Sequence, residues 1–554
     1  MNTWYTNKEN IPFSDSGDSS TLIQSLIDRM QDGDELIFTE GTYYFEHKVV
    51  ATNRKNLTLK GYGVTIITHF QAYMPREIEN AFEFIDSDNI SFMGFTFTTD
   101  NPTNIMGRIV KINKETGYFD VFLSNNVMLN GNEWIEGLDT FNEDYSINFH
   151  IGWADPGKCH RWHKINRNTV RFPVWLSKIP DLDDIHIGEL ICMRFSTYPA
   201  GTFSLINCHK VLFEDITIES CAGQSCVASP GCSEFTFRRY NIRPAYNTVQ
   251  GIACNTDGIV FKGLAKSLLM EDCHFSYMGD DSLNVHCVCG TVFAIKGNVI
   301  ETGQLKLGHT LEEPPAESLS PYFAHKGDVI YIYDAKTMRK KAEITVDEYT
   351  VDRIVASKIE GEFEVGDTVV NSAYYPEVTI RNCSVSRSRA RGFLIRTHNV
   401  LIENCYFEKT AGPAIKATCG IGIWNEMGPI HHMTIKNCVF EGCHTNKYPS
   451  RADGIVIGGG MGYSRNFSVQ DVGVYADIHI INNRFYNLPS PALFAVAVDG
   501  LELRGNEIYN CCNKPLEDEH ERYKHDLITY NCKNVVVSDN CSLTNECEYY
   551  NESI

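Results

Sequence analysis

Three aspartates about one repeat apart are the residues of this chain best suited to chemistry. Asp257 lies in an Asn-Thr-Asp-Gly segment at 255–258, and Asp280 and Asp281 follow it by 23 and 24 residues. If the chain winds once in each such interval, residues one period apart stack on neighbouring strands at about 4.8 Å. Three carboxylates would then converge on one patch of surface, which is the equipment for cleaving a glycosidic bond by general acid and base.

A structural role is the alternative for each aspartate. Asp in a turn often bonds its own backbone, and for Asp257 alone that interpretation is favoured. The adjacent carboxylates of Asp280 and Asp281 repel each other, however, and such coupling can raise the pKa of one group, as a general acid requires. With Asp257 one coil away, the three aspartates together favour a catalytic site.

Three basic residues are candidates for binding a substrate. His286 follows Asp281 by five residues, and its ring could bind a sugar hydroxyl or tune Asp280, with a structural histidine as the alternative. Arg391 and Arg396 lie where the chain returns to its repeat. Guanidinium groups bind hydroxyls and carboxylates well, but arginines in a repeat protein also pair with acids on neighbouring coils.

Asn255, Trp424 and Glu426 complete the candidates for substrate binding. Trp424 and Glu426 follow a glycine-rich stretch at 420–423. An exposed indole beside polar groups can stack on the apolar face of a sugar, and packing on the protein body is the alternative. Asn255 opens the segment that carries Asp257, so its amide is placed near the same site.

Short strand-like segments with a common ending must position these residues. Most alternate apolar residues and end in Asn or Asp followed by Cys or Asn, at 212–215, 269–273, 378–383, 401–405, 433–438, 478–483 and 501–506. The interval is 22 residues from Cys383 to Cys405 and 23 residues from Asn483 to Asn506. A fixed period of this length, with one strand signature in each unit, is typical of a solenoid.

These repeats predict an all-β fold, a right-handed parallel β-helix. The Asn/Asp positions would turn the chain in each coil, because Asn tolerates the left-handed backbone and bonds to its neighbours above and below. The Cys positions beside them would stack in the core. One helix is expected at 21–30, capped by Ser19 or Ser20, and it would cover the N-terminal end of the solenoid.

Two stretches that lack the repeat interrupt the solenoid. Short alternating strands at 106–197 and at 290–372 predict two small inserted antiparallel β-barrels. The β-helix then divides into an N-terminal part at 1–105, catalytic coils at 198–289 and a C-terminal part at 373–554. The second insertion begins just after the aspartate pair, so it is placed to overhang the site.

Charge and composition exclude several classes of partner. The chain has 70 acidic and 49 basic residues, a net charge of -21 and no basic stripe, which argues against nucleic acid and against polyanionic substrates such as pectate. No run of about 18 apolar residues occurs, so a membrane span is not expected. The N-terminal segment lacks the apolar core of a signal peptide, which predicts a cytoplasmic protein if Met1 is native and a secreted or periplasmic one if a signal has been removed.

The 20 cysteines are best interpreted as free, buried, small hydrophobic residues in a reducing environment. A structural zinc site needs two close pairs of ligands at suitable spacing. Neither Cys287 with Cys289 nor Cys511 with Cys512 supplies such a set. We therefore expect no metal and no cofactor.

The segments around the aspartates resemble the catalytic signature of polygalacturonases, which are parallel β-helix glycosidases. Those enzymes also carry Gly-His-Gly and Arg-Ile-Lys, which bind an acidic sugar, whereas here Ser-Leu-Asn-Val-His follows Asp281 and no Arg-Ile-Lys follows. The whole chain is more similar to family 110 of the glycoside hydrolases, the exo-acting α-1,3-galactosidases. The shared features are the β-helix, the two insertions, Asp-Asp-Ser-Leu-Asn-Val-His at 280–286 and Arg-Gly-Phe-Leu-Ile-Arg-Thr at 391–397.

This resemblance implies an inverting exo-glycosidase that hydrolyses terminal α-1,3-linked galactose in blood-group-B-like or linear glycans. It implies that Asp280 is the general acid and that Asp257 and Asp281 hold and deprotonate the attacking water. Inversion calls for carboxyl groups about 6.5 to 9.5 Å apart, which one or two coils plus side-chain reach can provide, whereas retention calls for about 5 to 5.5 Å. The resemblance and the long insertions are compatible with a homodimer.

Two other functions fit the same residues. A polygalacturonase-like hydrolase of another sugar would use the same aspartates. A non-catalytic glycan-binding β-helix would bind sugar without releasing product and would be indifferent to substitution of the aspartates.

Overall fold

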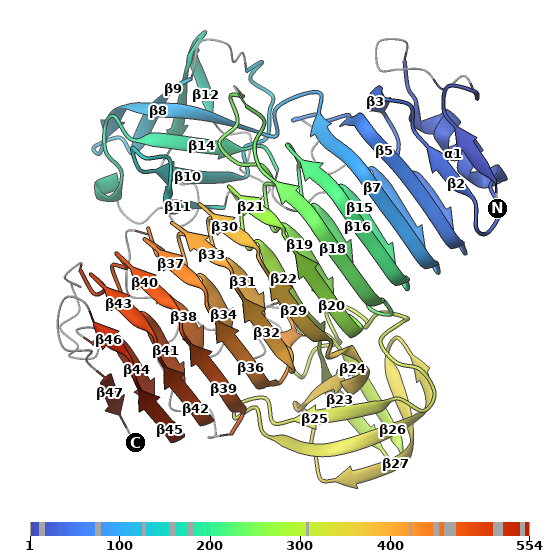
Figure 1. The fold of residues 1–554 in the computed structure, drawn as a ribbon, viewed down its shortest axis with the longest axis vertical. Coiled ribbons are helices and arrows are strands. Elements are labelled where there is room, and N and C mark those ends of the chain that lie inside the picture. The colour runs from blue at the N-terminus through green and yellow to red at the C-terminus, as the bar shows by residue number, and fades with distance from the viewer. Residues whose placement is uncertain are drawn as a thin grey trace.

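The body of the molecule is a right-handed parallel β-helix whose coils stack in series between the two ends of the chain (Figure 1). The fold class predicted from the sequence is therefore confirmed. The computed structural model describes residues 2–9, 11, 17–72, 79–123, 129–153, 162–173, 182–196, 198, 200–246, 248–305, 310–419, 424–446, 454–458, 473–513, 525–542 and 549–552.

Two sheets, of 21 and 13 described strands, run along the solenoid. The larger sheet contains β1 (Thr3–Tyr5), β2 (Glu35–Ile37), β3 (Gly41–Phe45), β5 (Lys55–Thr68), β7 (Asp88–Thr99), β16 (His209–Ile218), β18 (Ser233–Ile242), β20 (Ala265–Glu271), β21 (His274–Ser276), β29 (Glu377–Arg381), β30 (Ser384–Ser386), β32 (Val400–Glu403), β33 (Tyr406–Glu408), β36 (Ile430–Lys436), β37 (Val439–Glu441), β39 (Tyr475–Ile481), β40 (Arg484–Tyr486), β42 (Val498–Arg504), β43 (Glu507–Tyr509), β45 (Lys533–Ser538) and β46 (Cys541–Ser542). The smaller sheet contains β4 (Val49–Thr52), β6 (Phe82–Ile85), β15 (Phe203–Ile206), β17 (Cys226–Ala228), β19 (Ile259–Lys262), β22 (Leu283–Val288), β31 (Phe393–Ile395), β34 (Ile415–Ala417), β38 (Ile455–Ile457), β41 (Leu493–Val496), β44 (Leu527–Tyr530), β47 (Tyr549–Glu552) and the antiparallel β35 (Glu426–Met427).

The core between the sheets is built from columns of like residues in register. Phe407 pairs with Phe440 and Phe440 with Phe485 on successive coils, and their stacked rings have centroids 5.0 and 4.7 Å apart. Alternate residues of each strand point inward because strand side chains have a period of two. Stacking equivalent residues therefore buries a continuous apolar core along the whole solenoid.

The chain turns within the larger sheet at a column of Asn and Asp residues that we call the corner column. Its members have φ between 53 and 55°, the left-handed region that Asn and Asp tolerate better than other residues with a Cβ. The residue after each turn points inward and is buried. The members are Asp272, Asn382, Asn404, Asn437 and Asn482, and the buried residues that follow them are Cys273, Cys383, Cys405, Cys438 and Asn483.

This arrangement confirms the interpretation of the cysteines. Every cysteine in the described ranges is a free thiol, and most are buried. In the same ranges, no helix combines the length and the apolar surface that crossing a bilayer demands.

Helix α1 (Ser20–Arg29) covers the N-terminal end of the solenoid, as predicted. Its residues Ile23, Leu26 and Ile27 are buried in the core. The side chain of Gln24 bonds both the main-chain nitrogen and the main-chain oxygen of Val50 at 2.6 and 2.9 Å, so the helix satisfies the free edge of β4.

The predicted cap of this helix was wrong. Ser19 forms no side-chain cap bond. Asp18 instead accepts hydrogen bonds from the main-chain nitrogens of Ser20 and Thr21 at 2.9 and 3.3 Å. A carboxylate offers two acceptor oxygens, so it serves two of the unpaired N–H groups of the first turn.

The two insertions project from different parts of the β-helix (Figure 1). The second is a closed barrel in the order β23-β24-β27-β26-β25-β28, as predicted. Its strands are β23 (Gly290–Lys296), β24 (Val299–Gly303), β25 (Val329–Tyr333), β26 (Lys340–Thr350), β27 (Arg353–Gly361) and β28 (Thr368–Asn371).

The first insertion is a seven-stranded antiparallel sheet in the order β11-β10-β14-β8-β9-β13-β12. Its strands are β8 (Asn104–Asn113), β9 (Tyr118–Leu123), β10 (Gly137–Phe141), β11 (Ile147–Trp153), β12 (His163–Asn166), β13 (Thr169–Pro173) and β14 (Leu190–Arg194). Within the described residues the two end strands do not pair with each other. All four residues of β12 are exposed, so this strand gains little apolar burial from ring closure.

Candidate active site

The three aspartates lie in loops that lead into consecutive strands of the smaller sheet. Asp257 stands two residues before Ile259, the first residue of β19, and Asp281 stands two residues before Leu283, the first residue of β22. Ile259 and Leu283 are partners in the parallel register, so the two aspartates occupy equivalent positions on neighbouring coils. The parallel register therefore brings together the carboxylates that the sequence spacing had predicted to meet.

The same register extends this stack to four coils. Cys226 pairs with Ile259, and Leu283 pairs with Phe393. The residues two positions before these strands form a stack that we call the acidic column: Gln224, Asp257, Asp281 and Arg391.

The backbone of the two aspartate loops is closely packed. The main-chain nitrogen of Gly279 donates to the oxygen of Cys254 at 2.8 Å, and that of Asp280 donates to Thr256 at 3.1 Å. A Cβ on Gly279 would lie 2.1 Å from the main-chain oxygen of Asn255. Only glycine allows the loops to approach this closely, which explains the Gly before the aspartate pair.

The carboxylates of Asp257, Asp280 and Asp281 converge on one point. One oxygen of each lies within 4.8 Å of an oxygen of the other two. Asp257 is 6% exposed and Asp281 1% exposed, whereas the side chain of Asp280 is 13% exposed. Asp280 is therefore the most accessible of the three.

Each carboxylate has a partner from a different coil or loop. The amide of Gln224 donates to Asp257 at 3.3 Å. Asp281 accepts from the main-chain nitrogen of Arg391 at 3.0 Å and from its guanidinium at 2.7 Å. Asp280 forms an ion pair with Arg389 at 2.5 Å and accepts from the hydroxyl of Tyr198 at 3.3 Å.

Burial and like charge favour a proton in this cluster. Burial, reinforced by the charges of Asp280 and Asp281, raises the pKa of Asp257 well above its ordinary value. Burial also raises the pKa of Asp281, to about 6, although Arg391 opposes the shift. Carboxylates this close titrate as a group, so the cluster as a whole holds a proton near neutral pH.

A second polar cluster surrounds Glu426 on β35. Its carboxylate accepts from Asn284 at 3.3 Å and from the guanidinium of Arg396 at 2.7 Å, and the ring of His286 lies 3.7 Å away. Although burial opposes the shift, His286, Arg396 and Arg391 lower the pKa of Glu426 to about 2. Glu426 is therefore an ionised acceptor next to the aspartates.

His286 and Arg396 are buried more deeply than a pure sugar-binding role requires. His286 is 3% exposed and Arg396 0% exposed. Burial lowers the pKa of His286 to about 4, so its ring is neutral at pH 7. Both residues hold the carboxylate of Glu426, and Glu426, with its side chain 14% exposed, is the member of this cluster that reaches the surface.

Trp424 is exposed, as the sugar-stacking hypothesis requires. Its side chain is 57% exposed, and its ring centroid lies 5.9 Å from that of Tyr198, which is 49% exposed. Asn425, next to Trp424, donates its amide to the main-chain oxygen of Leu305 and so fixes this loop to the second insertion. The glycine-rich stretch at 420–423 lies outside the described residues.

Asn255 lies away from the accessible side of the site. It is 0% exposed, and its amide donates to the main-chain oxygen of Thr103 at 2.9 Å and to the hydroxyl of Ser196 at 3.2 Å. Its carbonyl accepts from the side chain of Asn104 at 3.0 Å. These contacts give Asn255 the task of holding its loop, in place of the sugar contact expected from the sequence.

Three residues of the site were missed from the sequence. Gln224 lies 33 residues before Asp257, well outside the period, and Tyr198 lies beyond the last strand of an insertion. Arg389 lies two residues before Arg391, so alternation along the chain was the one available signal. None of the three carries a motif of its own.

A metal ion does not fit the aspartate cluster. Oxygen donors from three carboxylates suit Mg²⁺ or Ca²⁺ in principle. Here guanidinium groups already lie 2.5 and 2.7 Å from Asp280 and Asp281. These fixed positive charges occupy the positions from which a cation would be attracted.

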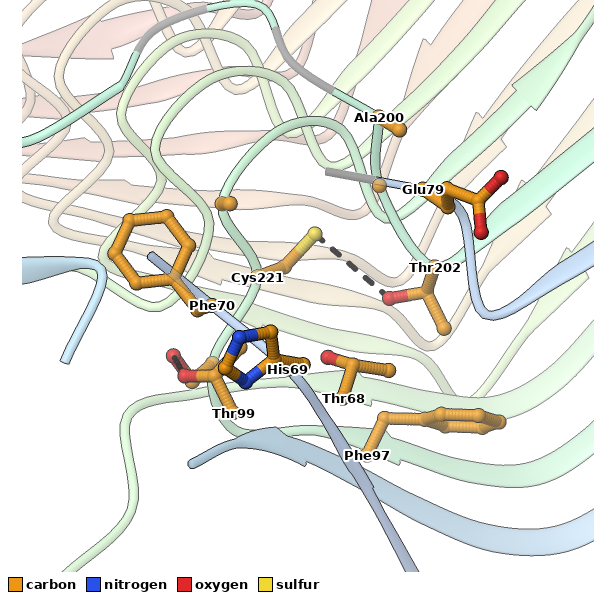
Figure 2. A pocket seen from close by; sticks show the side chains of 12 residues that line it. Thr68, His69, Phe70, Glu79, Phe97, Thr99, Ala200, Thr202 and Cys221 are labelled. Atoms are coloured by element: carbon orange, nitrogen blue, oxygen red, sulfur yellow. Dashed lines mark hydrogen bonds between the residues drawn. The ribbon is translucent and has the colours of Figure 1, made fainter. Parts of the chain in front are cut away.

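A hollow lies one coil before the aspartate loops (Figure 2). Cys221 on its wall forms a parallel bridge with Cys254, and the hydroxyl of Thr202 donates to its sulfur at 3.7 Å. The imidazole of His69 is bonded to Asp100 at 2.7 Å. The hollow therefore extends the surface beside the carboxylates towards the N-terminal coils.

The distance between carboxylates differs from the expected one. A gap of about 6.5 to 9.5 Å was expected for inversion, whereas the nearest oxygens lie within 4.8 Å. The expectation from coil spacing was wrong because Asp257 and Asp281 stack directly in register, with no tilt that separates their side chains.

Known proteins resemble this chain in sequence and fold. The family description right handed beta helix region matches residues 324–471. Alpha-1,3-galactosidase A of Bacteroides fragilis is 30% identical over 291 residues, which cover 51% of this chain and 46% of that protein. Alpha-1,3-galactosidase B of Bacteroides thetaiotaomicron is 23% identical over 563 residues, which cover 94% of this chain and 87% of that protein.

The match therefore spans about half the length of the first relative and most of the second. Among solved structures, the family 28 exopolygalacturonase of Yersinia enterocolitica covers 97% of this chain and 78% of its own, with 11% identity and a TM-score of 0.44. The resemblance to α-1,3-galactosidases predicted from the sequence is confirmed by the two curated relatives.

Proposed function

We propose that the chain is a glycoside hydrolase that removes terminal α-1,3-linked galactose from blood-group-B-like or linear glycans. The observation that carries this proposal is the convergence of three aspartate carboxylates from two neighbouring coils within 4.8 Å. The relatives named α-1,3-galactosidase supply the sugar and the linkage.

The local charge supports a neutral sugar over a uronic acid. The carboxylates of Asp257, Asp280, Asp281 and Glu426 face the guanidinium groups of Arg389, Arg391 and Arg396. Each of these arginines already pairs with one of the carboxylates. A galacturonate would bring a further negative charge into a group of four acids and three arginines, and like-charge contact disfavours that.

In the proposed reaction, Asp280 protonates the leaving oxygen while a water attacks the anomeric carbon. The bond from that carbon to the leaving oxygen breaks as the bond to the water oxygen forms, and a proton of the water passes to Asp257 or Asp281. Asp280 suits the acid role because it is the most exposed of the three and contacts Tyr198. The two carboxylates of the acidic column suit the water because they lie directly above each other.

Inversion is the proposed stereochemistry, and it rests on the family resemblance. The short distance between carboxylates favours retention on geometric grounds. A nucleophile must reach the anomeric carbon, however, and Asp281 is only 1% exposed and tied by two bonds to Arg391. The first anomer released therefore decides between the two mechanisms.

Sugar binding is assigned to Glu426 and the aromatic pair. The ionised carboxylate of Glu426 accepts hydrogen bonds from sugar hydroxyls, while Asn284, His286 and Arg396 fix its position. The exposed rings of Trp424 and Tyr198 offer apolar faces on which a galactose ring stacks.

The test is an assay of the purified chain on p-nitrophenyl α-galactoside, p-nitrophenyl β-galactoside, a terminal α-1,3-galactosyl disaccharide and polygalacturonate. Release of galactose from the α-linked substrates alone, unaffected by EDTA, is the expected result. Proton NMR of the first product is expected to show β-galactose, and α-galactose would overturn inversion. Sugar binding without release from any substrate would instead support a glycan-binding β-helix.

A further inference from the structure

The first insertion reaches the catalytic loops through one arginine. Arg194, the last residue of β14, is 0% exposed. Its Nη1 donates to the main-chain oxygens of Asn255 at 2.6 Å and of Gly279 at 3.0 Å. One oxygen lies in the loop that carries Asp257, and the other directly precedes Asp280. A single guanidinium therefore ties together the two loops from which the catalytic carboxylates project.

Asp139 on β10 fixes this guanidinium in place. Its carboxylate accepts from Nε of Arg194 at 2.8 Å and from Nη2 at 3.3 Å, and both side chains are 0% exposed. Gly137 makes room for the pair, since a Cβ there would lie 2.9 Å from Nε. A lysine offers one point charge and cannot reproduce this fork, which holds a carboxylate on one side and two carbonyls on the other.

The same charges continue into the site. Arg389 donates from Nε to the main-chain oxygen of Gly279, the oxygen that Arg194 also binds, and pairs with Asp280 at 2.5 Å. Two arginines thus lie between Asp139 of the insertion and Asp280 of the site.

A second strand of the insertion grips the same loop. The side-chain oxygen of Asn104 on β8 accepts from the main-chain nitrogens of Gly251 and Ile252 at 2.9 and 3.1 Å. The loop that ends in Asp257 is therefore held from the insertion at both of its ends.

We infer that Arg194, oriented by Asp139, is a positioning residue that sets the distance between Asp257 and Asp280. The inference rests on the proposed function for its catalytic consequence. Arg194 is fully buried and so acts through the loops rather than on the sugar. The role of the first insertion is then to hold two coils of the solenoid in register at the site, where hydrogen bonds within the loops alone must otherwise do so.

The test uses a charge-balanced double variant, Arg194→Met with Asp139→Asn, so that no buried charge is left without its partner. The matched control is Arg171→Met with Asp120→Asn, since Arg171 of β13 holds Asp120 of β9 through Nε and Nη2 at 2.6 and 2.9 Å in the same sheet. The measurements are kcat and KM for p-nitrophenyl α-galactoside, and hydrogen exchange of the amides at 253–258 and 279–283.

The expected result is a fall in kcat of about 100-fold with KM changed by less than about 3-fold, because misplacement near 1 Å costs catalysis on this scale. Exchange should accelerate in both loops and remain as in the native chain elsewhere in the β-helix. The control pair should change neither quantity. If the double variant does not fold, Arg194→Lys, which keeps the charge, is expected to lower kcat about 10-fold with faster exchange in the same loops.

Native kcat in the double variant, or unchanged exchange in the two loops, would overturn the inference. Equal losses in the control pair would do the same, since they would reduce Arg194 to general stability of the insertion. The exchange measurement needs no substrate. A native chain without galactosidase activity therefore refutes the proposed function, whereas unchanged loop exchange refutes the role of Arg194.

Discussion

The corner column and the acidic column are both stacks of polar residues on successive coils, yet they solve opposite problems. In the corner column, Asn382 donates its amide to Asp272 at 3.2 Å, and an amide both donates and accepts. In the acidic column, Asp257 and Asp281 are neighbours, and ionised carboxylates only accept. Their donors come from the two ends of the stack, Gln224 on one side and Arg391 on the other.

The difference shows where the fold spends stability on chemistry. A stack of amides satisfies its own hydrogen bonds, so the solenoid repeats it freely. Two buried carboxylates raise each other's pKa and need a cation and an amide to hold them. We expect substitutions in the corner column to change stability and not activity, and substitutions in the acidic column and Asp280 to change activity and improve or preserve stability.

The largest expected effect is the loss of turnover in Asp280→Asn. An amide cannot protonate the leaving oxygen, and general acid catalysis contributes about 100-fold to 10,000-fold in rate. We expect kcat to fall by about 1,000-fold while circular dichroism and the melting temperature stay near the native values.

A leaving group that needs no protonation sharpens this prediction. The defect should be smaller for an activated aryl α-galactoside with an acidic phenol than for the α-1,3 disaccharide. Native turnover of the disaccharide by Asp280→Asn would remove Asp280 from the acid role.

The second prediction concerns the pH dependence of stability. The pKa of Asp281 rises from 3.8 to about 6 on folding, so the folded state binds this proton more tightly than the unfolded chain. The stability that results is fully present below pH 4 and is lost as pH rises through 6. The shift corresponds to about 3 kcal/mol in the free energy of unfolding.

Asp281→Asn should remove this dependence. The free energy of unfolding of the variant minus that of the native chain should rise by about 3 kcal/mol between pH 4 and pH 7, measured by urea titration. Other titrating groups cancel in this difference. A difference that stays level across the range would show that Asp281 is ionised in the folded chain at all these pH values.

The two columns also differ in how far the sequence predicts them. The corner column was predicted with its backbone conformation, because Asn and Cys recur at a nearly constant interval and φ near 54° is a local property. The pairing of Asp257 with the aspartate pair was predicted for the same reason, since their spacing matches one coil. Local periodicity is therefore sufficient for residues on consecutive, uninterrupted coils.

Contacts across insertions could not be predicted in this way. Arg391 lies 110 residues after Asp281 because the second insertion separates their coils, and Asn255 is held by Thr103 and Asn104 from the first insertion. Asn255 was assigned to sugar binding because an amide beside a catalytic aspartate is typical of both roles. Only its burial distinguishes them, and burial here depends on residues about 150 positions earlier.

The third prediction is a stability change without a functional one. Asn404 is an exposed member of the corner column with φ of 54°. Asn404→Ala should lower the free energy of unfolding by about 1 to 2 kcal/mol, the cost of placing a Cβ without a polar side chain in the left-handed region. Its kcat and KM should equal those of the native chain.

Asn404→Gly is the matched control for backbone conformation. Glycine adopts positive φ without strain, so this variant should lose less stability than the alanine variant. Equal stability of the alanine variant and the native chain would show that the turn is held by the coils around it and not by the conformational preference of Asn.

The smallest expected effect is a gain of stability in Asp257→Asn. Burial and the charges of Asp280 and Asp281 raise the pKa of Asp257, so its ionised form destabilises the folded chain at neutral pH. An amide removes that charge and still bonds Gln224, which reaches Asp257 at 3.3 Å. We expect the free energy of unfolding at pH 7 to rise by about 1 kcal/mol, a typical gain for relieving a functional strain, while turnover is lost. The gain should vanish below pH 4, where the native aspartate is itself protonated in both states, and a variant that is less stable than the native chain at pH 7 would mean that the carboxylate of Asp257 is a net stabilising group in the acidic column.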